Sequence, residues 1–367
     1  NYALAGEEDQ KSMLLGYSGL LNLCDSNAST KFSVVTRKLN RRDFEDYIMI
    51  PYANDGHDHY RREYNAMLLE KASHASGMIR DLYITVTVTR KSYKDAESYF
   101  VRAGAEFTLA LSRLGSRCTE LDMMDRLRIL HGFYRHGEEA DFHFDPALSM
   151  KLGHSFQDYI CPDSIEMEKD HYCIDGRWGR VLYLRDYANY IKDTLIQELC
   201  DLNRTMILTI DMIPVPTDEA VKQTTLQLDK VEANVTRYNQ RQQANQNFTG
   251  AIPHDMELQR KEAKEFLDDL TTRDQRMLLC CVTMTHTAPS LEELDSDTES
   301  LLSVARKHLC QMSTLKYQQS DGLNTVLPYG VRTIDTLRTM TTESTAVLMP
   351  FKTQELFDGG GICYGHN

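Results

Sequence analysis

Two apolar runs in the second half of the chain constrain its fold more than any other feature. Residues 205–215 (TMILTIDMIPV) have the length and composition of a buried strand. Residues 277–285 (MLLCCVTMT) are apolar on both faces, as expected for a strand in the centre of a sheet. The residues between the two runs have helical spacing. This arrangement predicts an α+β fold in which a long helical segment is inserted between two strands.

The helical segment opens at Thr217, directly after Pro216, and carries a heptad-like seam. The seam recurs at alternating spacings of three and four residues: Val221, Thr224, Leu228, Val231, Val235 and Tyr238. A Gln- and Asn-rich turn follows, and residues 256–270 return as a second helix. We therefore predict a projecting helical hairpin over residues 217–272, with the five larger seam residues as candidate partner contacts. Packing of both helices on the sheet, with the seam as core, is the alternative.

The first 140 residues alternate between strand and helix patterns. The clearest strand is DLYITVTVTR at residues 81–90, and the clearest helix runs from Ser92 to Gly115, a residue suited to ending a helix. Further strands are predicted at 1–5, 31–39 and 118–121, and further helices at 7–24, 59–73 and 124–133. With the helix at 59–73 treated as an insertion, this is the βαβ–βαβ-like order of a ferredoxin-like domain.

The rest of the chain predicts a second domain of the same kind. Residues 141–170 are irregular, with Pro146 as a breaker, and are predicted to connect the two domains. The second domain, residues 171–335, contains a β-hairpin around residues 176–178 and both apolar strands. The predicted fold class is α+β, with two consecutive ferredoxin-like α/β sandwich domains at 1–140 and 171–335 and the helical hairpin inserted in the second.

Charge and composition indicate a cytosolic chain. The net charge of −13 repels phosphate and disfavours stable nucleic-acid binding. A basic patch at Arg37, Lys38, Arg41 and Arg42 is the exception, and it either contacts DNA or anionic lipid or forms a solvated face. The nine cysteines include no CxxC pair, as expected for free thiols in a reducing compartment. No apolar run approaches the roughly 20 residues needed to span a bilayer.

No complete catalytic motif is present in the sequence. It contains no GxxxxGK[ST], GxGxxG, HExxH or GxSxG pattern. His136, Asp141 and His143 lie in a short run rich in carboxylates and are weak candidates for metal ligands. The interleaved Phe142 and Phe144 favour another interpretation, a half-buried extended segment whose charged side chains point outward. We therefore expect no metal site and no catalytic residue in this chain.

Several segments near the end of the chain resemble one protein family. They are residues 317–330 (YQQSDGLNTVLPYG), 337–346 (LRTMTTESTA) and 349–356 (MPFKTQEL). In order and spacing they are similar to segments of the conjugative transfer (type IV secretion) ATPases of the TraE/VirB type, in the branch found in Gram-positive integrative conjugative elements. Residues 126–134 and 273–277 resemble earlier segments of the same family.

The resemblance implies a role for the parent protein. Such ATPases are often hexamers at the cytoplasmic base of a secretion channel, where a C-terminal domain uses ATP and Mg²⁺ to drive transfer. Their N-terminal region docks on inner-membrane components of the channel. The chain begins without Met and stops at Asn367, so both ends are expected to be boundaries within a longer protein. Residues 336–367 would then lead into an ATPase domain whose P-loop lies beyond Asn367.

On this interpretation the chain is a docking and regulatory region at the inner face of the cell membrane, not an enzyme, with no cofactor of its own. Two alternatives stay open. One is a free-standing module that binds a protein or a single-stranded nucleic acid. The other is a metal-dependent enzyme built on the run from His136 to His143.

Overall fold

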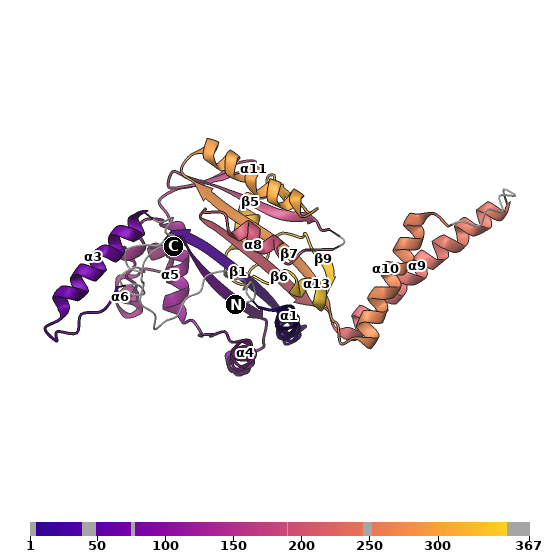
Figure 1. The fold of residues 1–367 in the computed structure, drawn as a ribbon, viewed down its shortest axis with the longest axis horizontal. Helices are drawn as coiled ribbons and strands as arrows, with labels where there is room; N and C mark the ends of the chain where they lie inside the picture. The colour runs from indigo at the N-terminus through magenta and orange to yellow at the C-terminus, as the bar shows by residue number, and fades with distance from the viewer. Residues whose placement is uncertain (1–4, 39–48, 75–77, 189, 245–251, 351–367) are drawn as a thin grey trace.

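The computed structural model describes residues 5–38, 49–74, 78–188, 190–244 and 252–350. These residues form a mixed α+β fold around an open antiparallel sheet of nine strands (Figure 1). The strands are β1 (Ala28–Lys38), β2 (Met78–Val88), β3 (Ile165–Met167), β4 (Tyr172–Ile174), β5 (Arg177–Asp186), β6 (Met206–Pro214), β7 (Met277–Ala288), β8 (Gln311–Thr314) and β9 (Arg338–Thr341). Seven strands follow the order β2-β1-β6-β7-β5-β4-β3, while β8 pairs with β5 and β9 with β7. Strands from both predicted domains thus belong to one sheet.

Helices surround this sheet and extend beyond it. In the described residues they are α1 (Glu7–Leu21), α3 (Asp58–His74), α4 (Tyr93–Arg113), α5 (Met123–Tyr134), α6 (Pro146–Leu152), α7 (Gln157–Ile160), α8 (Leu195–Cys200), α9 (Thr217–Ala244), α10 (His254–Thr272), α11 (Leu291–Lys307), α12 (Gln319–Val326) and α13 (Thr342–Ala346), with a short 3₁₀ turn at Glu139–Asp141. The predicted helix from Ser92 corresponds to α4, whose N-cap is the Ser92 side chain.

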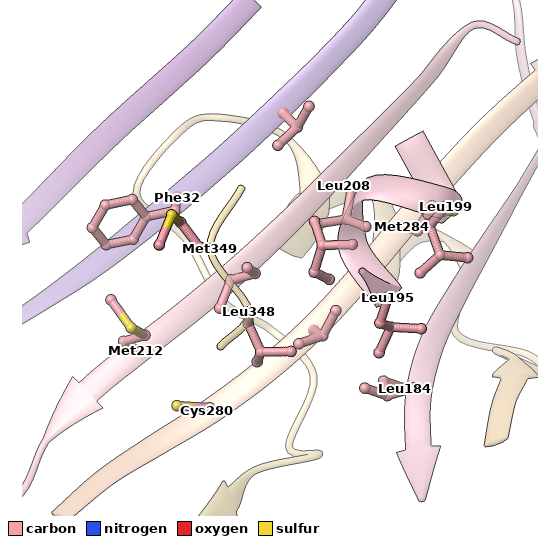
Figure 2. Packing of buried hydrophobic residues seen from close by; sticks show 14 of the residues in the cluster. Phe32, Leu184, Leu195, Leu199, Leu208, Met212, Cys280, Met284, Leu348 and Met349 are labelled. Atoms are coloured by element: carbon pink, nitrogen blue, oxygen red, sulfur yellow. The ribbon is translucent and has the colours of Figure 1, made fainter. Parts of the chain in front are cut away.

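The two faces of the sheet differ in character. The face that carries Phe32, Leu208 and Met284, here called the apolar face, packs against α1, α4, α8, α11 and α13. Figure 2 shows Leu195 and Leu199 of α8 in this cluster. The opposite face, here called the polar face, carries Lys31, Asp211 and Tyr172 and is covered by α12 and the segment after it. Because strand side chains alternate, each strand contributes to both faces.

A separate group of helices lies beyond one end of the sheet, where Figure 1 shows α3, α5 and α6. Leu127, Phe142 and Ile160 form a small apolar cluster within it. Residues 141–170 were predicted to be irregular, but they contain α6 and α7. The side chain of Asp145 accepts hydrogen bonds from two amides of α6, and Pro146 occupies its first turn. Proline is favoured there because that position has no helical partner for an N–H group, so this Pro begins a helix rather than breaking one.

Residues 118–121 were predicted to form a strand and do not. Gly115, with φ of 75°, ends α4, and Asp122 starts α5 with a capping box. The stretch between these two helix signals turns the chain from α4 into α5, and Cys118 within it packs against the apolar-face cluster.

The helices α9 and α10 pack against each other and project away from the sheet (Figure 1). They occupy the span predicted for a helical hairpin. Its base is an apolar cluster of Ala220, Leu270 and Met277, all buried. Among the described residues, none of the helices combines the length and the apolar character needed to cross a membrane.

Candidate functional site

A large cavity lies on the polar face, between the ends of several strands and α5. Its volume is about 1030 Å³. Apolar and aromatic side chains make up much of its wall: Val35, Ile79, Tyr83, Ile129, Phe133, Tyr172, Ile174 and Ile207. Concave sites with such a lining and a few polar groups are the usual setting for ligand binding. This cavity is therefore the candidate functional site.

Five carboxylates line the cavity, and each is engaged by a donor. Asp81 accepts a hydrogen bond from Arg37 Nε at 2.8 Å, and Glu138 accepts one from Arg135 at 3.2 Å. The other three are Asp125, which binds Arg128, Glu139, which lies 3.4 Å from His136 and accepts from the amide of Gly137, and Asp175, which accepts from the amides of Asp163 and Ser164. Although burial raises the pKa of Glu139, the hydrogen bonds from His136 and Gly137 lower it to about 2.

Arg177 differs from the other arginines of the cavity. Its Nε donates to Thr287 Oγ1 at 2.8 Å, and none of the ion pairs found in the described part of the chain involves its guanidinium. Burial lowers the pKa of Arg177 below its usual value, although Tyr172 and Glu139 oppose this shift. Within the described part of the chain, Arg177 is therefore a partly desolvated cation of the cavity that forms no ion pair, although Glu139 and Glu293 act on it at longer range.

The three predicted metal candidates have different surroundings in the structure. His136 lies on the cavity wall beside Glu139, whereas the ring of His143 bonds the carbonyl oxygen of Phe142 at 2.8 Å, and Asp141 is exposed. In the described residues, no three His, Cys, Asp or Glu side chains come close enough to hold a metal ion.

The basic patch is only partly described. Arg37 and Lys38 line the cavity, and Arg37 is paired with Asp81. Arg41 and Arg42 lie outside the described residues. Arg37 therefore serves at least to hold one carboxylate of the cavity wall.

A second feature of the polar face is a buried ion pair between Lys31 of β1 and Asp211 of β6, which are register partners with 3.6 Å between Nζ and Oδ1. Lys31 also donates to the carbonyl oxygens of Thr325 and Val331. Neither carboxylate oxygen of Asp211 has a hydrogen-bond partner among the described residues. Burial lowers the pKa of Lys31 and raises that of Asp211 to about 6, an effect that each partner's charge reduces.

Sequence reasoning missed Arg177, Lys31 and Asp211. Asp211 had a visible signal, because it is the one charged residue in the run TMILTIDMIPV. A carboxylate inside a buried strand needs a partner, which points to a lysine or arginine elsewhere. Arg177 had a weaker signal, its place directly after Asp175-Gly176.

The predicted seam follows the less exposed side of α9, a helix that packs against α10. Val235 is buried, and Val221, Leu228, Val231 and Tyr238 are half-buried. The other buried positions of α9 in the described chain, Ala220 and Thr224, have the same helical spacing. The seam therefore packs within the hairpin, and its residues are only partly available to a partner.

The exit of the hairpin is tied to the segment from β9 to α13. The amide of Arg276 donates to Thr342 Oγ1 at 3.0 Å, and the amide of Thr342 donates to the carbonyl oxygen of Arg276 at 3.1 Å. Gln275 Oε1 accepts from the amide of Glu343 at 2.8 Å, and Met277 pairs with Thr341. These contacts, here called the hairpin junction, connect the exit of the hairpin to the last described elements.

The chain matches no protein-family model, and no curated protein matches it either. The assignment of function therefore depends on the geometry of the cavity, the hairpin and the hairpin junction.

Proposed function

We propose that this chain is the non-catalytic docking and regulatory region of a conjugation (type IV secretion) ATPase, and that it binds inner-membrane components of the channel. The observation that carries the proposal is the hairpin junction. A motor that works on a membrane channel needs a rigid element that reaches its partner and a fixed connection back to the motor. The hairpin supplies the first, and the bonds between Arg276 and Thr342 supply the second.

The position of the hairpin in the sheet supports this role. It emerges from β6 and returns to β7, which are neighbouring central strands, and the amide of Val215 donates to the carbonyl oxygen of Met277 at its base. A displacement of the hairpin therefore acts on the middle of the sheet and on residues 338–346 together. In the proposed parent protein, residues 336–367 connect to the ATPase domain.

The strand order also supports the finer fold assignment. Strands β5 to β8 lie in the order β8-β5-β7-β6, all antiparallel, with α8 between β5 and β6 and α11 between β7 and β8. This is the βαββαβ order of a ferredoxin-like unit. We propose that residues 177–314 form such a unit, with the hairpin inserted between its second and third strands and β1 and β2 extending its sheet.

The proposal is tested first on the gene. Translation of the parent reading frame past Asn367 should show an apolar strand followed by GxxxxGK[ST] within a few tens of codons. The purified chain alone should not hydrolyse ATP. A stop codon directly after Asn367, or ATP turnover that persists through further purification, would contradict the proposal.

The docking role is tested on the hairpin itself. A variant in which residues 218–272 are replaced by a short Gly/Ser linker should keep the sheet, because β6 and β7 already pair at the hairpin base. It should lose binding to the channel's inner-membrane subunits when these are co-expressed and purified in detergent. Equal binding by both forms would refute a docking role for the hairpin.

Two point variants separate the seam from the outer surface of α9. Leu228→Asp places a charge on the less exposed side of α9 and should destabilise the hairpin, because Leu228 is half-buried in a hairpin whose two helices pack together. Leu226→Asp alters an exposed side chain and should leave the hairpin folded. Loss of channel binding by the folded Leu226→Asp protein would identify the outer surface as the contact.

A further inference from the structure

Arg177 is held in place by a tight turn. Asp175 and Gly176 both have positive φ, 46° and 77°, and Ile174 pairs directly with Arg177 across them. Two central residues with positive φ make the turn type that matches the twist of a β-hairpin, and Asp-Gly is a favoured sequence for it. Arg177 is thus the first residue of β5, and its backbone position is fixed before any ligand arrives.

The carboxylates of Glu139 and Glu293 favour the charged form of Arg177, but among the described residues no carboxylate forms an ion pair with it. The hydroxyl of Thr287 accepts from Nε, which leaves the outer nitrogens of the guanidinium with no carboxylate within 4 Å among the described residues. The carboxylates of the cavity wall are held by other donors, such as Arg37 for Asp81 and Arg135 for Glu138. A partly buried cation without a counter-ion is costly, so an anion in the cavity would be stabilised there.

The rest of the cavity suits an apolar body. Tyr172 forms part of the wall and is fixed by a 2.6 Å hydrogen bond between its hydroxyl and Thr285 Oγ1. Tyr83, Phe133 and Ile207 add apolar surface. At about 1030 Å³ the cavity has room for a ligand of considerable size, since ligand sites commonly range from about 300 to 1,000 Å³.

We propose that the cavity binds a small amphipathic oxyanion, whose carboxylate or phosphate accepts hydrogen bonds from the guanidinium of Arg177 and whose apolar body lies against Tyr83, Phe133 and Ile207. The planar guanidinium matches both oxyanions because it donates two parallel N–H groups. This site is separate from the hairpin, and the inference does not depend on the proposed docking function.

Isothermal titration calorimetry with three ten-carbon probes tests the proposal on the full chain. Sodium decanoate and decyl phosphate offer the two oxyanions on the same apolar body, and decyltrimethylammonium chloride offers the opposite charge. All three are used below the concentrations at which they form micelles. We expect at least one of the anions to bind with one molecule per chain and the cation not to bind. The tighter of the two anions identifies the headgroup.

A matched pair of variants assigns the binding to Arg177. Arg177→Met keeps a stem of similar length and removes the charge, and should weaken anion binding about tenfold or more. Arg185→Met removes an exposed arginine from the same strand and should leave the affinity unchanged. Without ligand, Arg177→Met should melt at the same or a higher temperature than the unaltered chain, because it removes an unpaired, partly buried charge.

Weaker anion binding together with an unchanged or higher melting temperature in Arg177→Met would distinguish a ligand-binding arginine from a structural one. The proposal is overturned if neither anion binds the unaltered chain, or if the cation binds as tightly as the anions. It is also overturned if folded Arg177→Met retains the affinity for the better anion.

Discussion

The apolar and polar faces of the sheet use the same strands for different purposes. Leu208 and Thr209 are neighbours on β6, yet Leu208 packs in the large cluster under five helices, while Thr209 bonds Ser33 and the carbonyl oxygen of Val326. The apolar face holds side chains that need only shape and volume to pack. The polar face holds a buried ion pair, bonded hydroxyls and the candidate cavity, all of which need specific partners.

This difference teaches where stability and specificity come from in this protein. Apolar burial is non-directional, so many side chains could fill the apolar face. The groups of the polar face are stabilising only when each one finds its own partner, since an unpaired buried polar group is costly. The polar face should therefore be more sensitive to the loss of one partner, and the apolar face to the loss of volume.

The largest effect is expected from breaking the buried ion pair. Lys31→Met should lower the free energy of unfolding by about 3–5 kcal/mol at pH 7, because it leaves Asp211 buried without its counter-ion, so that this carboxyl must either stay charged in the interior or take up a proton well above its usual pKa. Urea denaturation followed by circular dichroism measures this loss. The double variant Lys31→Met/Asp211→Leu should recover most of it, since neither charge is then buried. A cost below about 1 kcal/mol for the single variant would show that the pair is not desolvated in solution.

A loss of volume on the apolar face should cost somewhat less. Leu208→Ala removes a side chain that is 0% exposed at the centre of the cluster and should lower the free energy of unfolding by about 3 kcal/mol. Leu226→Ala on the exposed side of α9 is the matched control, and should stay within about 0.5 kcal/mol. If the two variants lost similar stability, the apolar face would be less tightly packed than the structure indicates.

The contribution of Asp211, on the polar face, to the free energy of unfolding should change by about 2–3 kcal/mol with pH. The pKa of Asp211 is raised to about 6 in the folded chain, from a usual value near 4. The folded state therefore binds more protons between these two values, and the contribution of Asp211 to stability is present at low pH and is lost as the pH rises through about 6. Urea titrations of the unaltered chain and Asp211→Asn at several pH values measure this difference.

In that experiment, the stability of the unaltered chain relative to Asp211→Asn should fall between pH 4 and pH 6.5. Other groups, such as Glu139, titrate in both proteins and cancel in the comparison. A relative stability that rose over this range would mean that Asp211 has a lowered pKa and a closer partner than the structure shows.

The difference between local and long-range interactions explains which features could be predicted from the sequence. The strands β6 and β7 and the helix α4 were predicted nearly at their observed bounds, because apolar runs, periodicity and caps are local signals. The pairing of β1 with β6 was not predictable, since it joins distant segments through backbone bonds that any sequence makes. For the same reason the cavity was not predicted. Its cation, Arg177, is significant only because segments far apart in the chain surround it without forming an ion pair to it in the described residues.

The smallest effect should come from one hydroxyl of the polar face. Thr209→Val keeps the volume of the side chain but removes the hydroxyl that donates to the carbonyl oxygen of Val326 at 2.6 Å and contacts Ser33 Oγ at 2.9 Å. It should cost about 1 kcal/mol of unfolding free energy, because one buried carbonyl loses its donor. Measured together with Ser33→Ala and the double variant, it gives the coupling between the two hydroxyls. A coupling near zero would mean that the two hydroxyls act independently, so that the cost of Thr209→Val reports its bond to Val326 at the end of α12.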